Sequence, residues 1–184
     1  MSLRPAIALF IALAVSACAS AGPRTAIDPA FEAPYTLDGG DKLRVVVFGQ
    51  EGISNSYAVD GSGKISMPLI GPVDARGRTT GQVAASITSK LRAGYVREPH
   101  VAVEVETFRP FFVLGEVTAA GQYAYVNNLT IETAVAIAGG FSARAHRSSF
   151  TITRNIGGHN YKATVPLSYA IRPGDTVTIH ERWF

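Results

Sequence analysis

Short runs of β-branched or alternating apolar residues, separated by turns that contain glycine, make up most of the chain after residue 34. Residues 42–48 (KLRVVVF) are rich in β-branched side chains and follow a DGGD turn at residues 38–41. At residues 101–106 valine alternates with alanine and glutamate, which is typical of a strand with one buried face. Similar strand patterns occur at residues 111–117, 150–153 and 176–180. The chain is therefore predicted to fold mainly as small sheets.

Two segments combine helical spacing of apolar residues with signals for the start of a helix. The first, residues 80–91, begins at a capping box formed by Thr79 and Gln82. The second follows Thr130 as its N-cap and ends at Gly139-Gly140. The predicted apolar faces consist of Val83, Ala84, Ile87 and Leu91, and of Ile131, Ala134, Val135 and Ala138.

One predicted helix lies among the strands of each half of the chain. This order predicts the α+β class, with two small domains in succession. Within the first half, residues 57–60 and 64–68 flank Gly61-Ser62-Gly63, and this arrangement predicts a β-hairpin.

A Gly-Asp turn precedes an apolar strand twice, at residues 40–41 and at residues 174–175. The Gly-Asp pair provides the only two identities between residues 37–43 and 171–177. We interpret the similarity as one turn solution used twice, not as a duplicated domain.

The composition excludes several classes of protein. With 47% hydrophobic and 17% charged residues, the chain is not intrinsically disordered. A single Cys excludes a disulfide scaffold and a cysteine-based metal site. The formal net charge of +3 is too small to indicate a protein that binds nucleic acid.

The N-terminal residues have the pattern of a secretion signal. Arg4 precedes an apolar stretch, residues 6–15, which is too short to span a membrane. Residues 15–18 (VSAC) resemble a bacterial lipobox and end at the only Cys of the chain. We therefore predict a signal peptide over residues 1–17, lipidation at Cys18 and an extended tether over residues 18–33. An ordinary signal peptide cleaved close to Cys18 is the alternative.

Catalytic and metal-binding motifs are missing from the sequence. No two of the four His residues lie within four positions of each other, and residues 61–64 (GSGK) do not complete a phosphate-binding loop. We expect no enzyme activity, no cofactor and no metal. The basic residues Arg144, His146 and Arg147 could contact an acidic polymer or a neighbouring subunit. A solvated loop is the interpretation we favour for them.

Ordered blocks of residues over about residues 33–184 resemble a known family. In the first half they are Tyr35, Leu37, Gly40, Asp41, Leu43, Val59, Asp60, Gly61, Gly63, Ile65, Pro68, Ile70, Gly71, Gly94, Tyr95, Pro99, Val101 and Val103. In the second half they are residues 112–117, 121–123, Ala134, Ala138, Gly139, Gly140, residues 172–175, Glu181, Arg182 and Phe184. With the lipobox, the chain resembles the outer-membrane polysaccharide export lipoproteins of capsule and exopolysaccharide secretion.

The resemblance implies a domain organisation and a function. Residues 34–107 would form a polysaccharide export domain, and residues 108–184 a β-grasp-like SLBB (soluble-ligand-binding β-grasp) domain. Such a protein would be lipid-anchored in the outer membrane, would face the periplasm and would assemble into a homo-oligomeric ring that passes polysaccharide. The alternative is an envelope lipoprotein whose β-grasp domain binds a soluble ligand or partner without forming a conduit.

Long members of this family end in an amphipathic helix that contributes to the pore. Here the sequence stops at Trp183-Phe184, directly after the last predicted strand. We therefore expect a short form that lacks this helix. Its expected partners are an inner-membrane polysaccharide co-polymerase or chain-length protein and a separate outer-membrane pore protein, predicted to be a β-barrel.

Overall fold

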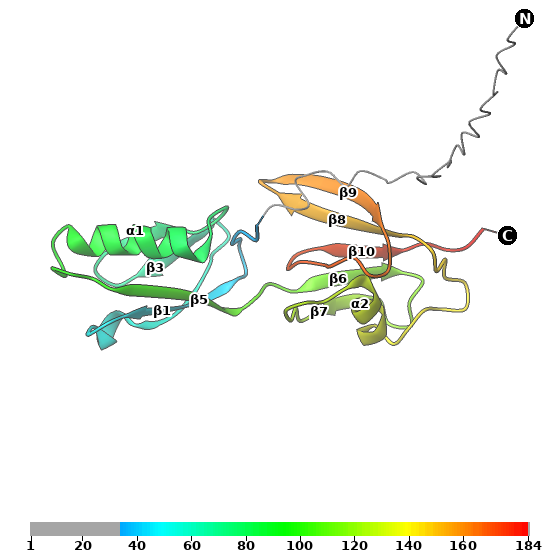
Figure 1. The fold of residues 1–184 in the computed structure, drawn as a ribbon, viewed down its shortest axis with the longest axis horizontal. Coiled ribbons are helices and arrows are strands. Elements are labelled where there is room, and N and C mark those ends of the chain that lie inside the picture. The colour runs from blue at the N-terminus through cyan, green and yellow to red at the C-terminus, as the bar shows by residue number, and fades with distance from the viewer. Residues whose placement is uncertain (1–33, 184) are drawn as a thin grey trace, which may run out of the picture.

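The computed structural model describes residues 34–183, which form two units side by side (Figure 1). Each unit has a hydrophobic core of its own. The N-terminal unit (residues 34–107) is centred on Leu43, Ile65 and Ile87, and the C-terminal unit (residues 111–183) on Phe111 and Phe150. The short linker Phe108-Arg109-Pro110 joins the two units.

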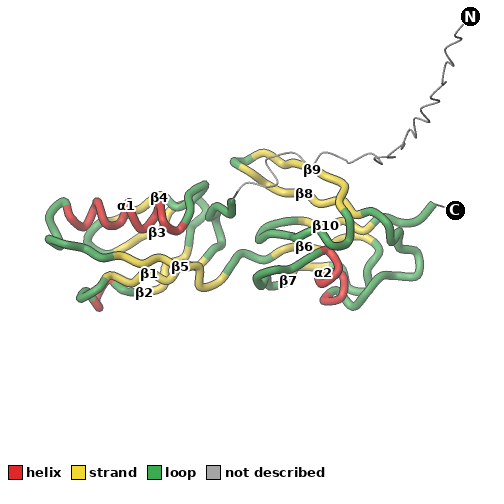
Figure 2. Tube along the Cα trace, in the orientation of Figure 1, coloured by secondary structure: helices red, strands yellow, loops and turns green. Residues whose placement is uncertain are grey.

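The N-terminal unit contains two antiparallel sheets and one long helix (Figure 2). The three-stranded sheet has the order β2-β1-β5, and β3 pairs with β4. Helix α1 packs against β5 and β4. The elements are β1 (Lys42–Val47), the 3₁₀ helix η2 (Glu51–Ile53), β2 (Asn55–Ala58), β3 (Lys64–Met67), β4 (Gly71–Asp74), α1 (Thr80–Arg92) and β5 (Val101–Thr107).

Helix α1 forms where the sequence predicts it. The Thr79 side chain accepts a hydrogen bond from the Gln82 N–H, and the Gln82 side chain accepts one from the Thr79 N–H. This capping box satisfies two N–H groups that the first turn would otherwise leave unpaired. Val83, Ile87 and Leu91 are fully buried on the face that covers the sheet.

The C-terminal unit is a five-stranded sheet with one short helix over a face. The strand order is β7-β6-β10-β8-β9; β6 and β10 are parallel, and the other pairs are antiparallel. A capping box of Thr130 and Thr133 starts the helix, which ends before Gly139 in the left-handed conformation. The elements are β6 (Phe111–Gly115), β7 (Gly121–Tyr123), α2 (Ile131–Ile137), β8 (Phe150–Ile156), β9 (His159–Val165) and β10 (Thr176–Ile179).

The α+β class is confirmed, but the predicted hairpin is wrong. β2 pairs with β1, and β3 pairs with β4, a strand that the sequence pattern did not reveal. The turn between β2 and β3 exists because the Asp60 carboxylate accepts hydrogen bonds from Ser62 and from the Lys64 N–H. The same tight turn can join paired strands or strands that diverge, so it does not specify the pairing.

Gly115 occupies a position in β6 that no other residue fits. Its φ is +88°, and a Cβ atom there would lie 2.0 Å from the Ile179 carbonyl oxygen of β10. β6 and β10 are neighbours in the centre of the sheet, so neither backbone can withdraw without loss of the ladder. The glycine is therefore required by packing and by backbone conformation together.

We predict that Gly115→Ala lowers the free energy of unfolding by about 3 kcal/mol or more, since overpacking and a strained φ combine. The matched control is Gly121→Ala in β7, because a Cβ at Gly121 meets nothing within 4 Å and its φ is not positive. Urea denaturation of both variants measures the difference. Equal stabilities of the two variants would contradict the packing argument.

Candidate ligand-binding cleft between the two units

The first Gly-Asp turn is built around a buried carboxylate. Asp41 is fully buried and accepts hydrogen bonds from the Asp38 N–H at 2.9 Å, from the Arg109 N–H at 2.9 Å and from the Tyr35 hydroxyl. Burial, and then the hydrogen bond to Asp41, raise the pKa of Tyr35, so this phenol stays protonated and remains a donor. The Asp41 side chain, at the end of the turn, thus stabilises the turn by accepting these hydrogen bonds.

Arg109 of the linker supplies the counter-charge for Asp41. Its Nη1 lies 3.0 Å from Asp41 Oδ2 and 2.9 Å from the Tyr35 hydroxyl, and the guanidinium carbon lies 5.4 Å from the centre of the Tyr35 ring. The preceding residue, Phe108, makes edge contacts with Tyr35 on one side and with Tyr125 on the other. The linker is therefore packed against residues of both units.

The second Gly-Asp turn repeats the arrangement in the C-terminal unit. Asp175 is fully buried and accepts a hydrogen bond from the Arg172 N–H, three residues earlier, just as Asp41 does from Asp38. Arg154 of β8 donates to both Asp175 oxygens, from Nε at 2.8 Å and from Nη2 at 2.7 Å. The interpretation that one turn solution is used twice is confirmed by these bonds.

Arg109 also touches the second turn. A Cβ atom at Gly174 would lie 2.5 Å from Arg109 Nε, and one at Gly40 would lie 3.4 Å from Arg109 Cβ. Both glycines have positive φ, and the Gly174 N–H donates to the Pro110 carbonyl at 3.0 Å. Arg109 therefore lies between the two turns and fits there because neither turn has a side chain at its glycine.

A cleft of about 490 Å³ lies at this junction. Its walls come from both units: residues 34–38 and 76–77 on one side, residues 154–158 and 172–173 on the other, with Arg109 between them. The volume falls within the range of roughly 300–1,000 Å³ that is usual for ligand pockets. Residues 154–158 belong to the end of β8 and its turn toward β9, a hairpin whose tip approaches the N-terminal unit (Figure 1).

The side chains of the cleft are dominated by arginine. Arg76, Arg109, Arg154 and Arg172 line it, and Asp38 is the only carboxylate among the lining residues. Burial raises the pKa of Asp38, but the hydrogen bonds from Arg76 and the Gly39 N–H, with the charges of Arg109 and Arg76, lower it overall. Asp38 is thus held as an anion by the cations around it.

Arg172 differs from the other three arginines. Its guanidinium makes no hydrogen bond or ion pair within residues 34–183, whereas Arg76 and Arg109 bind carboxylates directly, and Arg154 binds one bidentately. Burial, and then the charge of Arg154, lower the pKa of Arg172. The cleft therefore has an excess of positive charge at this residue.

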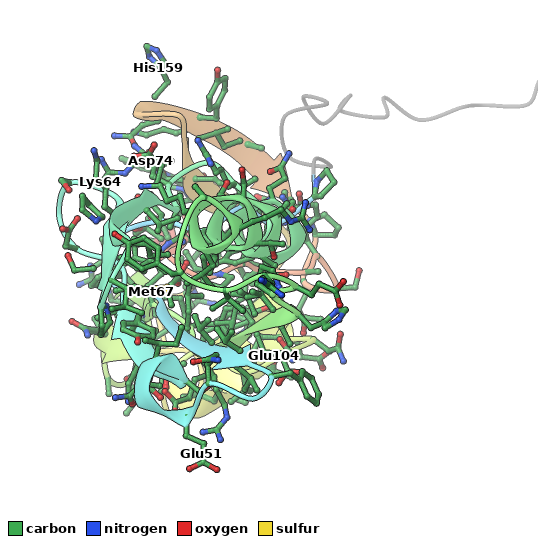
Figure 3. The ribbon with its side chains drawn as sticks, turned by 90° about the vertical axis from the view of Figure 1, so that its left-hand side faces the viewer. Glu51, Lys64, Met67, Asp74, Glu104 and His159 are labelled. Atoms are coloured by element: carbon green, nitrogen blue, oxygen red, sulfur yellow. The ribbon has the colours of Figure 1, made fainter. Side chains whose placement is uncertain are left out.

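The other hollows and polar clusters of the described residues are weaker candidates for a ligand-binding site. A larger hollow of about 740 Å³ at the far end of the N-terminal unit is lined by Arg92, Arg97, Glu98 and His100, without a buried ion pair behind it. His159 points away from the body at the tip of the β8–β9 hairpin (Figure 3). Within the described part of the chain, no three His, Cys, Asp or Glu side chains gather as a metal site would require.

The basic loop after α2 is exposed at Arg144 and Arg147, in agreement with the solvated loop that the sequence analysis favoured, and it also contacts its own unit. Arg144 Nη2 lies 2.7 Å from Glu181 Oε1 and 3.7 Å from Glu116 Oε1. The Arg147 guanidinium stacks over the Phe141 ring at 5.6 Å. These contacts attach the loop to its own unit, while both arginines stay largely accessible to solvent.

Sequence reasoning named a different residue as the site. Cys18, the predicted lipidation residue, lies outside the described residues, so the structure gives no information on it. Arg109 and Arg154 were missed, and Arg172 was noted only as part of a motif. One signal was available: a buried Asp requires a cationic partner, and two Gly-Asp turns before buried strands imply two such partners.

Two family models match the chain in succession. Residues 29–106 match the polysaccharide biosynthesis/export protein model, and residues 110–162 match the SLBB domain model. The chain belongs to the polysaccharide export protein family. It is similar to the exopolysaccharide production protein ExoF of Rhizobium meliloti, at 36% identity over 58% of this chain. It is also similar to the polysialic acid transport protein KpsD of Escherichia coli, at 30% identity over 60% of this chain.

The matches cover only 28% of ExoF and 20% of KpsD. The matched family is named for polysaccharide biosynthesis and export, and these relatives for production and transport. Membership of an export and transport family agrees with the prediction that this protein is not an enzyme. Neither helix within residues 34–183 is long and apolar enough to cross a membrane.

We predict that Asp41→Asn lowers the free energy of unfolding by about 3 kcal/mol, because it leaves the largely buried Arg109 without its counter-charge. The control is Asp74→Asn, which removes one carboxylate from an exposed pair with Lys64 at 3.3 Å (Figure 3). That surface substitution should cost less than about 1 kcal/mol. Chemical denaturation measures both, and a similar small loss in the two variants would argue against Arg109 as the anchor of the junction.

Proposed function

We propose that this protein is a component of a translocon that exports a capsular or extracellular polysaccharide. The observation that carries the proposal is the succession of the two family domains in one chain, at residues 29–106 and 110–162. The names of the relatives support it: one is a polysialic acid transport protein, and the other an exopolysaccharide production protein. In this function the protein guides polymer and breaks no bond.

The proposed location is the periplasmic face of the outer membrane. Residues 1–17 act as a signal peptide, and Cys18 carries the lipid anchor. Residues 18–33 then tether a polysaccharide export domain (residues 34–107) and an SLBB domain (residues 108–184). The support is the lipobox-like sequence around the single Cys. Because stable anchoring takes more than one acyl chain, the Cys is proposed to be multiply acylated.

The protein acts as a homo-oligomeric ring or adaptor. A cyclic ring needs two different surfaces on each subunit that meet and close. Support comes from the sheet edges: within the described residues, β2 and β5 flank the first sheet, β7 and β9 flank the second, and each pairs on one side only. The ring would connect an inner-membrane polysaccharide co-polymerase or chain-length protein with a separate outer-membrane pore protein.

The second candidate function is an envelope lipoprotein that binds a ligand without forming a conduit. The arginine-lined cleft supports this alternative, because a hollow between two units can hold a small ligand without any conduit. The two candidates differ in what happens to polymer when the protein is removed.

We predict that deletion of the gene lowers secreted polysaccharide and raises the amount retained in the cell, because polymer synthesis continues while passage stops. The measurement is the ratio of secreted to cell-associated polysaccharide in the deletion strain, in the parent and in a complemented strain. An unchanged ratio would overturn the translocon function and favour the ligand-binding alternative.

We predict that Cys18→Ser releases the protein from outer-membrane fractions into the soluble periplasmic fraction. Each methylene buried in the bilayer contributes about 0.8 kcal/mol, so loss of the acyl chains removes the anchoring energy. Ser20→Ala, two residues away, serves as the control and should remain with membranes. Cys18→Ser protein that still sediments with outer membranes would refute lipid as the sole tether. A soluble wild-type protein would favour the ordinary signal peptide.

A further inference from the structure

The cleft between the units has more cationic than anionic groups. Its lining arginines are Arg76, Arg109, Arg154 and Arg172, and the carboxylates that bind three of them are Asp38, Asp41 and Asp175. Asp41 and Asp175 are fully buried behind the wall, so Asp38 alone presents a negative charge to the cleft. One guanidinium, that of Arg172, has no carboxylate partner within residues 34–183.

The position of Arg172 is fixed by the turn that precedes β10. Its backbone N–H donates to Asp175 Oδ2 at 2.6 Å, and Pro173 follows it. The buried Arg154–Asp175 pair holds that carboxylate in place from the other side. The backbone of Arg172 is therefore preorganised, and only its side chain must be ordered when an anion binds.

Arg172 and Arg154 repel each other, since the charge of Arg154 lowers the pKa of Arg172. An anion placed in the cleft would reduce this repulsion. A planar guanidinium matches a carboxylate, or a phosphate, with two parallel hydrogen bonds. One unpartnered arginine offsets a single negative charge, and each unit of an acidic sugar polymer carries one carboxylate. The chemistry that fits the cleft is therefore a singly charged oxyanion, of which a sugar carboxylate is the form we pursue.

We propose that the cleft binds a carboxylate-bearing sugar unit of the exported polymer, with Arg172 as the residue that contacts its carboxylate. This inference rests on the proposed export function for the identity of the ligand as a saccharide. The cleft volume of about 490 Å³ accommodates a small number of sugar units and not a folded partner. The polar side chains of Thr36 and Asn155 line the same cleft and are available to sugar hydroxyls.

The test is calorimetric titration of the full mature protein with α-1,4-linked trigalacturonate. Maltotriose serves as the neutral saccharide, and inorganic phosphate as the anion without a sugar. We expect binding of trigalacturonate only. Arg172→Gln should weaken that binding at least about tenfold, because hydrogen bonds to charged groups contribute about 1.5–3 kcal/mol. The affinity of Arg172→Lys should lie between those of the wild type and Arg172→Gln, since lysine keeps the charge and loses the planar fork.

The matched control is Arg44→Gln, which removes one positive charge from an exposed position of β1 that does not line the cleft. It should bind as the wild type does. Thermal unfolding of each variant shows whether the fold is retained. Equal binding of maltotriose, equal binding of phosphate, or unchanged affinity in Arg172→Gln would each overturn the inference.

Failure of this inference is distinguishable from failure of the proposed function. If gene deletion blocks secretion but trigalacturonate does not bind, the cleft assignment is wrong and the export function stands. If trigalacturonate binds through Arg172 and deletion leaves secretion unchanged, the cleft assignment stands and the export function is wrong.

Discussion

The contact between Asp41 and Arg109 is the interaction on which the junction of the two units depends. Asp41 is fully buried and the Arg109 side chain is only 17% exposed, so each charge would be costly without the other. Arg109 is fixed twice, because its backbone N–H and its guanidinium both donate to the Asp41 carboxylate. A single carboxylate thus determines where the linker leaves β5 and where β6 begins.

Ion pairs between aspartate and arginine also shape the cleft. Three arginines have their charges matched by Asp38, Asp41 and Asp175, and these pairs hold the walls in place. A wall whose charges are all matched would have little attraction for an ion. Arg172 breaks the balance, because its backbone belongs to the second turn while its side chain has no carboxylate partner among the described residues. Matched pairs build the cleft, and the unmatched cation gives it selectivity for anions.

Local structure was predictable from the sequence, but the pairing of distant residues was not. The capping boxes at Thr79 and Thr130 depend on residues three positions apart, and a short window of sequence contains them. The pairing of β3 with β4 was missed because a Gly-rich turn signals a change of direction and not a partner. Arg109 and Asp41 lie 68 positions apart, so nothing local connects them. The ion pairs of the site consist of such contacts, and sequence patterns therefore found its turns, with Arg172 as part of one motif, but not Arg109 or Arg154.

The glycines of the two turns show how motifs that carry no charged or reactive side chain can help to build a binding site. A Cβ at Gly174 would clash with Arg109, whereas one at Gly40 would lie at contact distance from it, on the side of the other turn. Gly174 therefore keeps open the space that a cation of the linker fills, and Gly40 allows the positive φ of the first turn. With Arg109 in that space, the first turn, the linker and the second turn pack together, and the cleft lies along the same line of contact. Residues that look purely structural in the sequence thus determine where an anion can bind, since they decide which arginines are neutralised and which is not.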